Sequence, residues 1–134
     1  MERKDLTLEQ EYALQSYEEG HNIFVTGPGG TGKTCLIKQI VQSAEKRNKK
    51  IQVCAMTGCA AILLGCKATT LHSWSGLKLA KGTLEELYTM VKENKMTLKK
   101  WKYIKTLIVD EVSMLSKRLF DILNVIGQRL RNSP

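Results

Sequence analysis

The sequence predicts an α/β protein in which helices cover both faces of a parallel sheet. Short strand segments rich in β-branched and aliphatic residues alternate with helical segments along the 134 residues. These strand segments are apolar almost throughout, which is typical of strands that are buried on both faces. Such an alternation favours parallel strands, in the order helix, strand, helix, strand, helix, helix, strand, helix.

The N-terminal part holds two helices separated by a strand and a glycine-rich segment. "TLEQ", from Thr7 to Gln10, is a capping box and predicts a helix over residues 8–19 that Gly20 ends. "NIFVTG" predicts a short strand that runs into the glycines. "KTCLIKQIVQSAEKR" then has apolar residues at helical spacing, which predicts an amphipathic helix over residues 33–47.

Two further strands and three helices are predicted in the remainder. "KKIQVCAM" is the second strand, and "KTLIVDE" is a third that ends in two carboxylates. "TGCAAILLG" is expected to be a short buried helix, and "TTLHSWSG" a loop or short helix. A second capping box at Thr83 opens a helix over 84–93, and the last helix runs from Ser116 to Arg131. Residues 92–105 hold six lysines and one glutamate and are expected to be a solvated surface, with DNA contact as the alternative.

Composition and charge exclude several classes of protein. The net charge of +8 suits a polyanionic partner such as nucleic acid, although a solvated basic surface is the alternative. No apolar run reaches the roughly 18 residues that span a bilayer, and "MERKDLTLEQ" has no apolar signal segment. The four cysteines form no CxxC pair and are expected to be small, buried and reduced. We therefore expect no membrane partner and an intracellular protein, in the nucleus or cytoplasm rather than secreted.

The glycine-rich segment predicts a phosphate-binding loop. Its match to GxxxxGK[ST] follows a strand and opens a helix, which is the arrangement that confirms this motif. Glycine backbones can turn their N–H groups toward phosphate oxygens, and the helix start adds a positive dipole end. Lys33 can reach the β- and γ-phosphates, while the Thr34 hydroxyl can ligate Mg²⁺. The predicted nucleotide-binding residues are Gly27, Pro28, Gly29, Gly30, Thr31, Gly32, Lys33 and Thr34.

The carboxylates at the end of the third predicted strand supply the second half of the site. Ligands of parallel α/β folds bind at the carboxyl ends of the strands, where Asp110 and Glu111 are expected. Asp110 is predicted to hold Mg²⁺ through its water shell, and Glu111 to orient and deprotonate the attacking water. Two adjacent acids favour hydrolysis over transfer to a substrate hydroxyl, because water needs a base more. We predict Lys33, Asp110 and Glu111 as catalytic residues of a Mg²⁺-dependent enzyme that hydrolyses a nucleoside triphosphate.

The order of motifs resembles one helicase family. "LTLEQ", "NIFVTGPGGTGKT", "AMTGCAAILLGCKATTLHSWSG" and "LIVDEVSMLSKRLFDIL" follow one another as in the petite-integration-frequency (PIF-type) DNA helicases, from residue 6 to 133. The resemblance implies a RecA-like P-loop NTPase fold, ATP hydrolysis and 5′-to-3′ movement on single-stranded DNA. It also implies roles in DNA repair, recombination and telomere maintenance.

The resemblance also implies roles for individual residues outside the phosphate loop. Gln10 would recognise adenine, a role compatible with its capping box. A single-strand track would use Thr57, Gly58, Ala60, Thr70, His72, Ser73 and Trp74, which offer amides, hydroxyls and close backbone approach to DNA. For Trp74, stacking on a base and burial in the core are alternatives. For His72, a DNA contact and a structural role are alternatives.

Several family features are changed or lacking. Met56 stands where the family usually has proline, and Gly30 where it has alanine. The family's following strand and second motor domain, with its arginine finger, do not appear, so the predicted sheet is incomplete at the C-terminus. The chain is therefore interpreted as the N-terminal part of a first motor domain that does not unwind DNA alone. A non-catalytic ATP- or DNA-binding module and, with less support, a small P-loop kinase are the alternatives.

Overall fold

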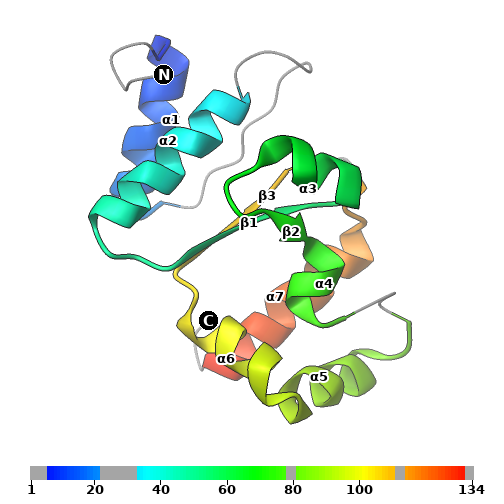
Figure 1. The fold of residues 1–134 in the computed structure, drawn as a ribbon. Helices are drawn as coiled ribbons and strands as arrows, with labels where there is room; N and C mark the ends of the chain where they lie inside the picture. Colours follow the sequence, from blue (N-terminus) through cyan, green and yellow to red (C-terminus); the bar gives the residue numbers. More distant parts are fainter. Residues whose placement is uncertain (1–5, 22–32, 78–80, 111–113, 132–134) are drawn as a thin grey trace. The chain divides into compact units, whose positions relative to one another are not determined.

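The computed structural model describes residues 6–21, 33–77, 81–110 and 114–131. The chain divides into two compact units, residues 1–49 and 50–134, which are described separately. Strands and helices alternate in the second unit, so the predicted α/β class is confirmed (Figure 1). Among the helices in the described ranges, none has the length and apolar character needed to cross a bilayer.

The first unit is built around two helices that pack on each other. Helix α1 spans Leu8–Glu18 and begins with the predicted capping box, in which Thr7 Oγ1 accepts the Gln10 N–H at 3.2 Å. Helix α2 spans Lys33–Lys46 and buries Leu36, Ile37, Gln39, Ile40 and Ala44. Ser43 Oγ donates to Glu18 Oε2 at 2.8 Å, which joins the C-terminal ends of the two helices. The strand predicted over "NIFVTG" lies outside the described residues.

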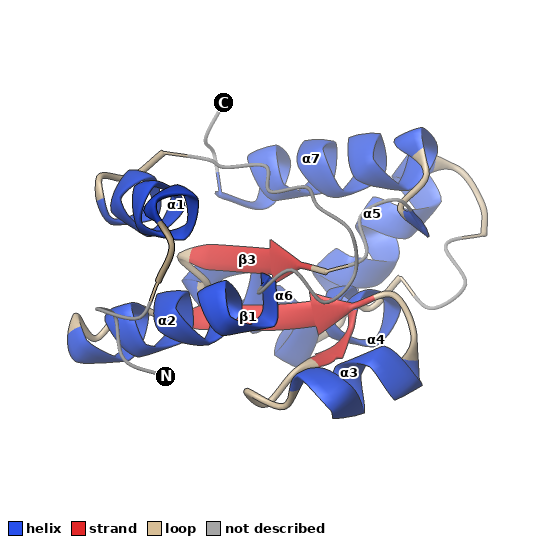
Figure 2. Ribbon diagram, turned by 90° about the horizontal axis from the view of Figure 1, so that it is seen from above, coloured by secondary structure: helices blue, strands red, loops and turns tan. Residues whose placement is uncertain are grey.

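The second unit contains a parallel sheet of three strands in the order β2-β1-β3. Strand β1 spans Ile51–Ala55, β2 Thr69–Thr70 and β3 Thr106–Val109; Figure 2 shows β1 and β3 side by side. In the register, Cys54 pairs with Val109 on one side and Thr69 on the other. Val53, Cys54 and Ala55 are all buried, so both faces of β1 are covered at these positions, as three consecutive apolar residues predict.

Five helices of the described ranges accompany this sheet: α3 (Gly58–Leu64), α4 (Leu71–Ser75), α5 (Leu84–Glu93), α6 (Lys95–Tyr103) and α7 (Lys117–Arg131). The core of the unit forms where α4, α5, α6 and α7 meet on one side of β1. It consists of Cys54, Leu71, Trp74, Leu77, Leu87, Val91, Trp101, Leu119, Ile122, Ile126 and Leu130. Helix α7 contributes four of these residues at helical spacing, which explains why its sequence pattern is so clear.

The structure corrects the expectation that residues 92–105 are only a solvated surface. Most of this segment is helix α6, whose inner side buries Thr97 and Trp101. The Trp101 indole Nε1 donates to the Ser75 carbonyl at 3.0 Å, and its ring lies 5.3 Å from that of Trp74. The lysines remain exposed on the outer side. One face of the segment is therefore structural, and only the other is solvated.

The expected burial of the cysteines holds for one of the four. Cys54 is fully buried in the core, and desolvation raises the pKa of its thiol to about 11. Cys59 is exposed, whereas Cys35 and Cys66 are half-buried. The expectation for these three is wrong because Cys35 in α2 and Cys59 in α3 lie on sides of their helices that are not fully covered, and Cys66 lies in the turn after α3. A small apolar residue is tolerated at such positions.

Gly76 ends α4 in the left-handed conformation, with φ of +76°. A Cβ at this position would lie 2.7 Å from Thr97 Cγ2 on α6. We expect Gly76→Ala to lower the free energy of unfolding by about 2–4 kcal/mol, because it adds backbone strain to a steric clash. Urea unfolding followed by circular dichroism measures the change.

A double-mutant cycle with Thr97→Ala separates the two causes. In the Thr97→Ala background the clash is removed, so the same glycine substitution should cost only about 1–2 kcal/mol, the strain of the left-handed backbone. Equal costs in the two backgrounds would show that the contact between α4 and α6 is not tight.

Candidate nucleotide and nucleic-acid site

The nucleotide half of the predicted site begins at the first residues of α2. Lys33 and Thr34 open this helix of 14 residues, with Lys33 half-buried and Thr34 exposed. The first turn contains no acidic residue, so the positive end of the helix dipole is not neutralised there. These are the surroundings that favour an anion such as a phosphate. The predicted loop residues Gly27, Pro28, Gly29, Gly30, Thr31 and Gly32 lie outside the described residues.

The acidic half lies at the carboxyl edge of the sheet in the second unit. Asp110 directly follows β3 and is half-buried, and its backbone N–H donates to the Cys54 carbonyl at 2.9 Å. This bond extends the pairing of β3 with β1 by one residue, so Asp110 leaves the sheet beside the end of β1. A carboxylate held at this edge can ligate a metal ion directly or through water. Glu111 lies outside the described residues.

The residues predicted for a single-strand track start at the same edge. Ala55, the last residue of β1, pairs with Thr70 of β2, so the segments that follow both strands emerge together. Thr57 caps α3 by accepting the Ala60 N–H at 3.2 Å, and Thr70 caps α4 by accepting the Ser73 N–H at 3.2 Å. Each hydroxyl accepts one bond from the backbone, so its own proton remains able to donate to a phosphate.

Exposure divides the predicted track residues into two groups. Thr57, Gly58 and Ser73 are exposed, and Ala60, Thr70 and His72 are half-buried, so all six present surface. A Cβ placed on Gly58 would have no atom within 4 Å, so the space beside this backbone is open. A sugar–phosphate chain can approach closely at such a position.

Trp74 belongs to the core, and base stacking does not fit its position. Its side chain is only 4% exposed and packs against Trp101. A stacked base needs an open ring face, and this ring has none. Of the two alternatives from the sequence, the structure favours burial. For His72 the half-buried side chain leaves both alternatives open.

Gln10 holds the capping-box position that the sequence predicts. Its side-chain oxygen accepts the Thr7 N–H at 2.9 Å. This bond fixes the direction of the amide group at the start of α1. Recognition of adenine by the same side chain stays a prediction.

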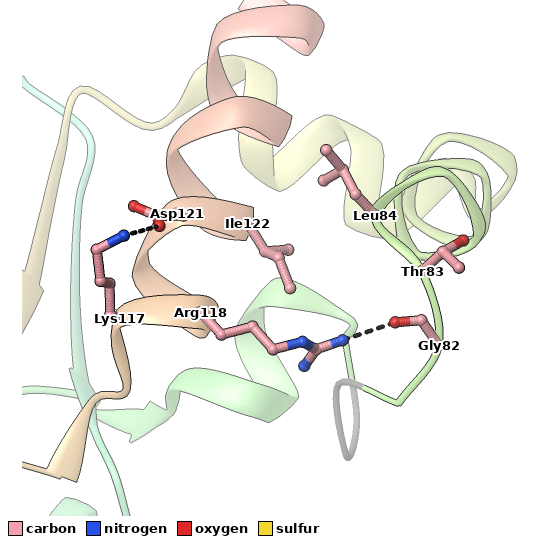
Figure 3. Close-up of a pocket in the computed structure, with 7 residues that line it drawn as sticks. All are labelled: Gly82, Thr83, Leu84, Lys117, Arg118, Asp121 and Ile122. Carbon is pink, nitrogen blue, oxygen red and sulfur yellow. Dashed lines mark hydrogen bonds and ion pairs between the residues drawn. The ribbon is translucent and has the colours of Figure 1, made fainter.

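A pocket that the sequence did not indicate lies between the starts of α5 and α7 (Figure 3). It has a volume of about 550 Å³ and is lined by Gly82, Thr83, Leu84, Lys117, Arg118, Asp121 and Ile122. Arg118 donates to the Gly82 carbonyl at 2.6 Å, and Lys117 pairs with Asp121 at 3.3 Å. The first bond ties the loop before α5 to α7, and the second lies within α7. None of the predicted site residues lines the pocket.

The parallel sheet with its accompanying helices, and the helix α2 that begins at Lys33 of the GxxxxGK[ST] motif, are the features of the α/β class of P-loop nucleotide-binding proteins. A family model described as PIF1-like helicase matches residues 5–133. The chain therefore belongs to the PIF1-like helicase family, and the resemblance found in its motifs is confirmed.

Individual relatives agree with this assignment. The chain is 38% identical over 130 residues to an ATP-dependent DNA helicase PIF1 of Saccharomyces cerevisiae, covering 96% of this chain and 15% of the relative. For the helicase PIF1 of Candida albicans the identity is 40%, over 96% of this chain and 14% of the relative. The crystal structure of Pif1 helicase from Candida albicans superposes with a TM-score of 0.88 at 40% identity, over 95% of this chain and 29% of that one. The chain thus spans about 15% of the length of such relatives.

Proposed function

We propose that the chain forms the N-terminal part of the first RecA-like motor domain of an ATP-dependent DNA helicase that moves 5′-to-3′ on single-stranded DNA. The relatives named ATP-dependent DNA helicases support the general activity. The same proposal includes an intracellular location. It also includes the roles in DNA repair, recombination and telomere maintenance that the resemblance to the family implies.

One observation carries this proposal. The Asp110 N–H bonds to the carbonyl of Cys54 in β1, and the segment that leaves the end of β1 contains Thr57 and Gly58. Asp110, a carboxylate that can hold Mg²⁺, follows β3, and the segment with Thr57 and Gly58, which DNA can approach, follows β1. The two therefore lie at the same edge of the sheet, after adjacent strands. A conformational change at the nucleotide can be transmitted to the nucleic-acid track through the adjacent ends of β1 and β3. Coupling of ATP hydrolysis to movement along DNA requires such a connection between the two sites.

Each residue of the site has a defined part in the proposal. Lys33 binds the β- and γ-phosphates, and Thr34 and Asp110 hold Mg²⁺, which neutralises charge on the phosphates when bound. Glu111 orients the attacking water and takes its proton. Convergence of these groups on one nucleotide is part of the proposal. An arginine finger from another domain supplies a further rate factor of about 10³–10⁵, so the chain alone should bind ATP better than it hydrolyses it.

Asp110→Asn tests the metal part of the site. We expect the substitution to remove most of the gain in ATP affinity that Mg²⁺ provides, by about 10- to 100-fold, because an amide lacks the charge that holds the metal's water shell. Affinity for ATP without Mg²⁺ should change little. Isothermal titration of the chain with ATP, with and without Mg²⁺, measures both values.

Asp121→Asn is the matched control, because Asp121 is an exposed carboxylate that pairs with Lys117. It should leave the Mg²⁺ dependence unchanged. If the two variants behave alike, Asp110 is not a metal-binding residue.

Binding of single-stranded DNA to the predicted track is measured by fluorescence anisotropy with labelled oligo-dT. If the chain does not bind oligo-dT at low salt, the predicted track is contradicted.

A further inference from the structure

The outer face of α6 carries a row of positive charge. Lys95, Lys99 and Lys102 are all exposed, and their i, i+4 and i+7 spacing places them on one side of the helix. We call these three residues the α6 lysine face. Among the described residues, none of them lies within 4.0 Å of a carboxylate, and Glu93 is the single acid in segment 92–105. No carboxylate of the described residues therefore pairs with this row.

Further cations extend this charge toward the amino end of the sheet. Lys105 follows α6, and its N–H donates to the carbonyl of Lys50 at 2.9 Å, so the two lysines lie side by side directly before the adjacent strands β3 and β1. Both side chains are exposed. Arg131 of α7 donates to the carbonyls of Trp101 and Ile104 at the C-terminal end of α6. Basic residues from α7 and from the segments before β1 and β3 thus lie near the C-terminal end of α6. Figure 1 shows this end of the helix leading toward β3.

The helix that carries the lysines is held firmly. Trp101 fixes its inner face through a hydrogen bond to Ser75 and packing on Trp74, and Thr97 lies against Gly76. A helix fixed in this way holds the backbone positions of the three lysines in a defined row. The row is about 10 Å long at 1.5 Å per residue, and a DNA duplex carries about six charges over that distance.

We propose that the α6 lysine face binds the phosphate backbone of duplex DNA, at a place separate from the single-strand track. Helix α6 leads into the amino end of β3, whereas the track residues follow the carboxyl ends of β1 and β2. Tyr103 is the one exposed aromatic residue of α6. Single-strand sites use several stacked aromatic rings in a groove, while duplex backbones are held mainly by rows of cations. The inference rests on the proposed DNA function, since it assigns a second DNA contact.

The salt dependence of duplex binding tests the proposal. The variant with Lys95→Gln, Lys99→Gln and Lys102→Gln is compared with wild type on a labelled duplex of about 20 bp between about 25 and 200 mM NaCl, by anisotropy. The slope of log K against log salt should fall by about 2–3, because each lost phosphate contact contributes about 0.9. The variant with arginine at the same three positions keeps the charge and should keep the slope.

A matched control separates this row from net charge. Lys38→Gln, Lys46→Gln and Lys49→Gln remove the same charge from exposed positions of the first unit and should change the slope by less than about 1. Equal effects of the two glutamine variants, or no effect of the first, would overturn the proposal. Circular dichroism establishes that each variant is folded.

Two further ligands distinguish duplex binding from binding to single strands or to anionic membranes. Affinity for oligo-dT should stay within about twofold in the α6 variant; a parallel loss would make the face part of the single-strand track and overturn the proposal. Loss of binding to phosphatidylserine vesicles with duplex binding retained would also overturn it. If wild type binds the duplex through this face but not oligo-dT, the proposed strand track fails and the duplex contact stands.

Discussion

Replacing Lys33 with alanine should abolish ATP turnover and weaken ATP binding by about 10- to 150-fold. Lys33 opens α2 at a helix end without acidic neighbours, next to the predicted phosphate loop. A charge-assisted hydrogen bond to a phosphate contributes about 1.5–3 kcal/mol, and about 1.4 kcal/mol corresponds to a factor of ten in affinity. Isothermal titration of the chain with Mg–ATP measures the binding, and phosphate release measures the turnover.

Lys38→Ala provides the comparison for this experiment. Lys38 is an exposed lysine on the same helix, just over one turn from Lys33, and it has no predicted role. Its removal should alter ATP affinity by less than about twofold. Wild-type turnover in the Lys33→Ala variant would rule out the motor assignment, since the mechanism has no other cation at this place in the chain.

Replacing Trp101 with alanine should lower the free energy of unfolding by about 3–5 kcal/mol. The indole is 5% exposed, packs on Trp74 and donates to the Ser75 carbonyl. Alanine leaves a cavity between α4 and α6 and an unpaired buried carbonyl. Trp101→Phe keeps most of the volume and should cost about 1–2 kcal/mol for the lost hydrogen bond. Urea unfolding followed by tryptophan fluorescence and circular dichroism measures both changes.

Tyr103→Ala is the control on the same helix. Tyr103 lies two residues further on and is 65% exposed, so its truncation should change the free energy of unfolding by less than about 0.5 kcal/mol. A Trp101→Ala variant as stable as Tyr103→Ala would mean that α6 is not anchored to the core. The fixed lysine row would then lose its basis.

The two tryptophans also connect the two proposed nucleic-acid contacts. Trp74 lies in α4, which the track residue Thr70 caps and which contains the track residue Ser73, and Trp101 holds the helix that bears the lysine face. A contact of 5.3 Å between their rings joins α4 to α6 through the core. Burial of Trp74 therefore gives the predicted track a rigid support.

Much of this architecture can be predicted from local sequence. The predicted boxes at Thr7 and Thr83 mark the starts of α1 and α5, because each threonine side chain accepts a backbone N–H three residues further on. The capping box is complete at Thr7, whereas the Glu86 carboxylate bonds to the Thr83 hydroxyl. The regular apolar spacing also predicts α2 and α7 correctly, since the apolar residues of each helix form the face that is buried. Such signals depend on neighbours in the chain and need no tertiary information.

Strand β2 and helix α6 could not be predicted in this way. Strand β2 has only two residues, Thr69 and Thr70, and exists because they pair with Cys54 and Ala55 of β1. Helix α6 has a high lysine content that resembles a solvated segment, and its inner face depends on contacts with Ser75 and Gly76. Both elements owe their form to partners distant in sequence.

The sequence by itself determined the α/β class, the phosphate-loop motif and the membership of the chain in its family, because these depend on residue types at fixed spacing. Only the tertiary structure decided that Trp74 is a core residue, that Asp110 leaves the sheet beside β1, and that three lysines form one outward row on α6. Burial, strand register and the direction of a helix face follow from which segments pack together, and a local pattern does not contain that information.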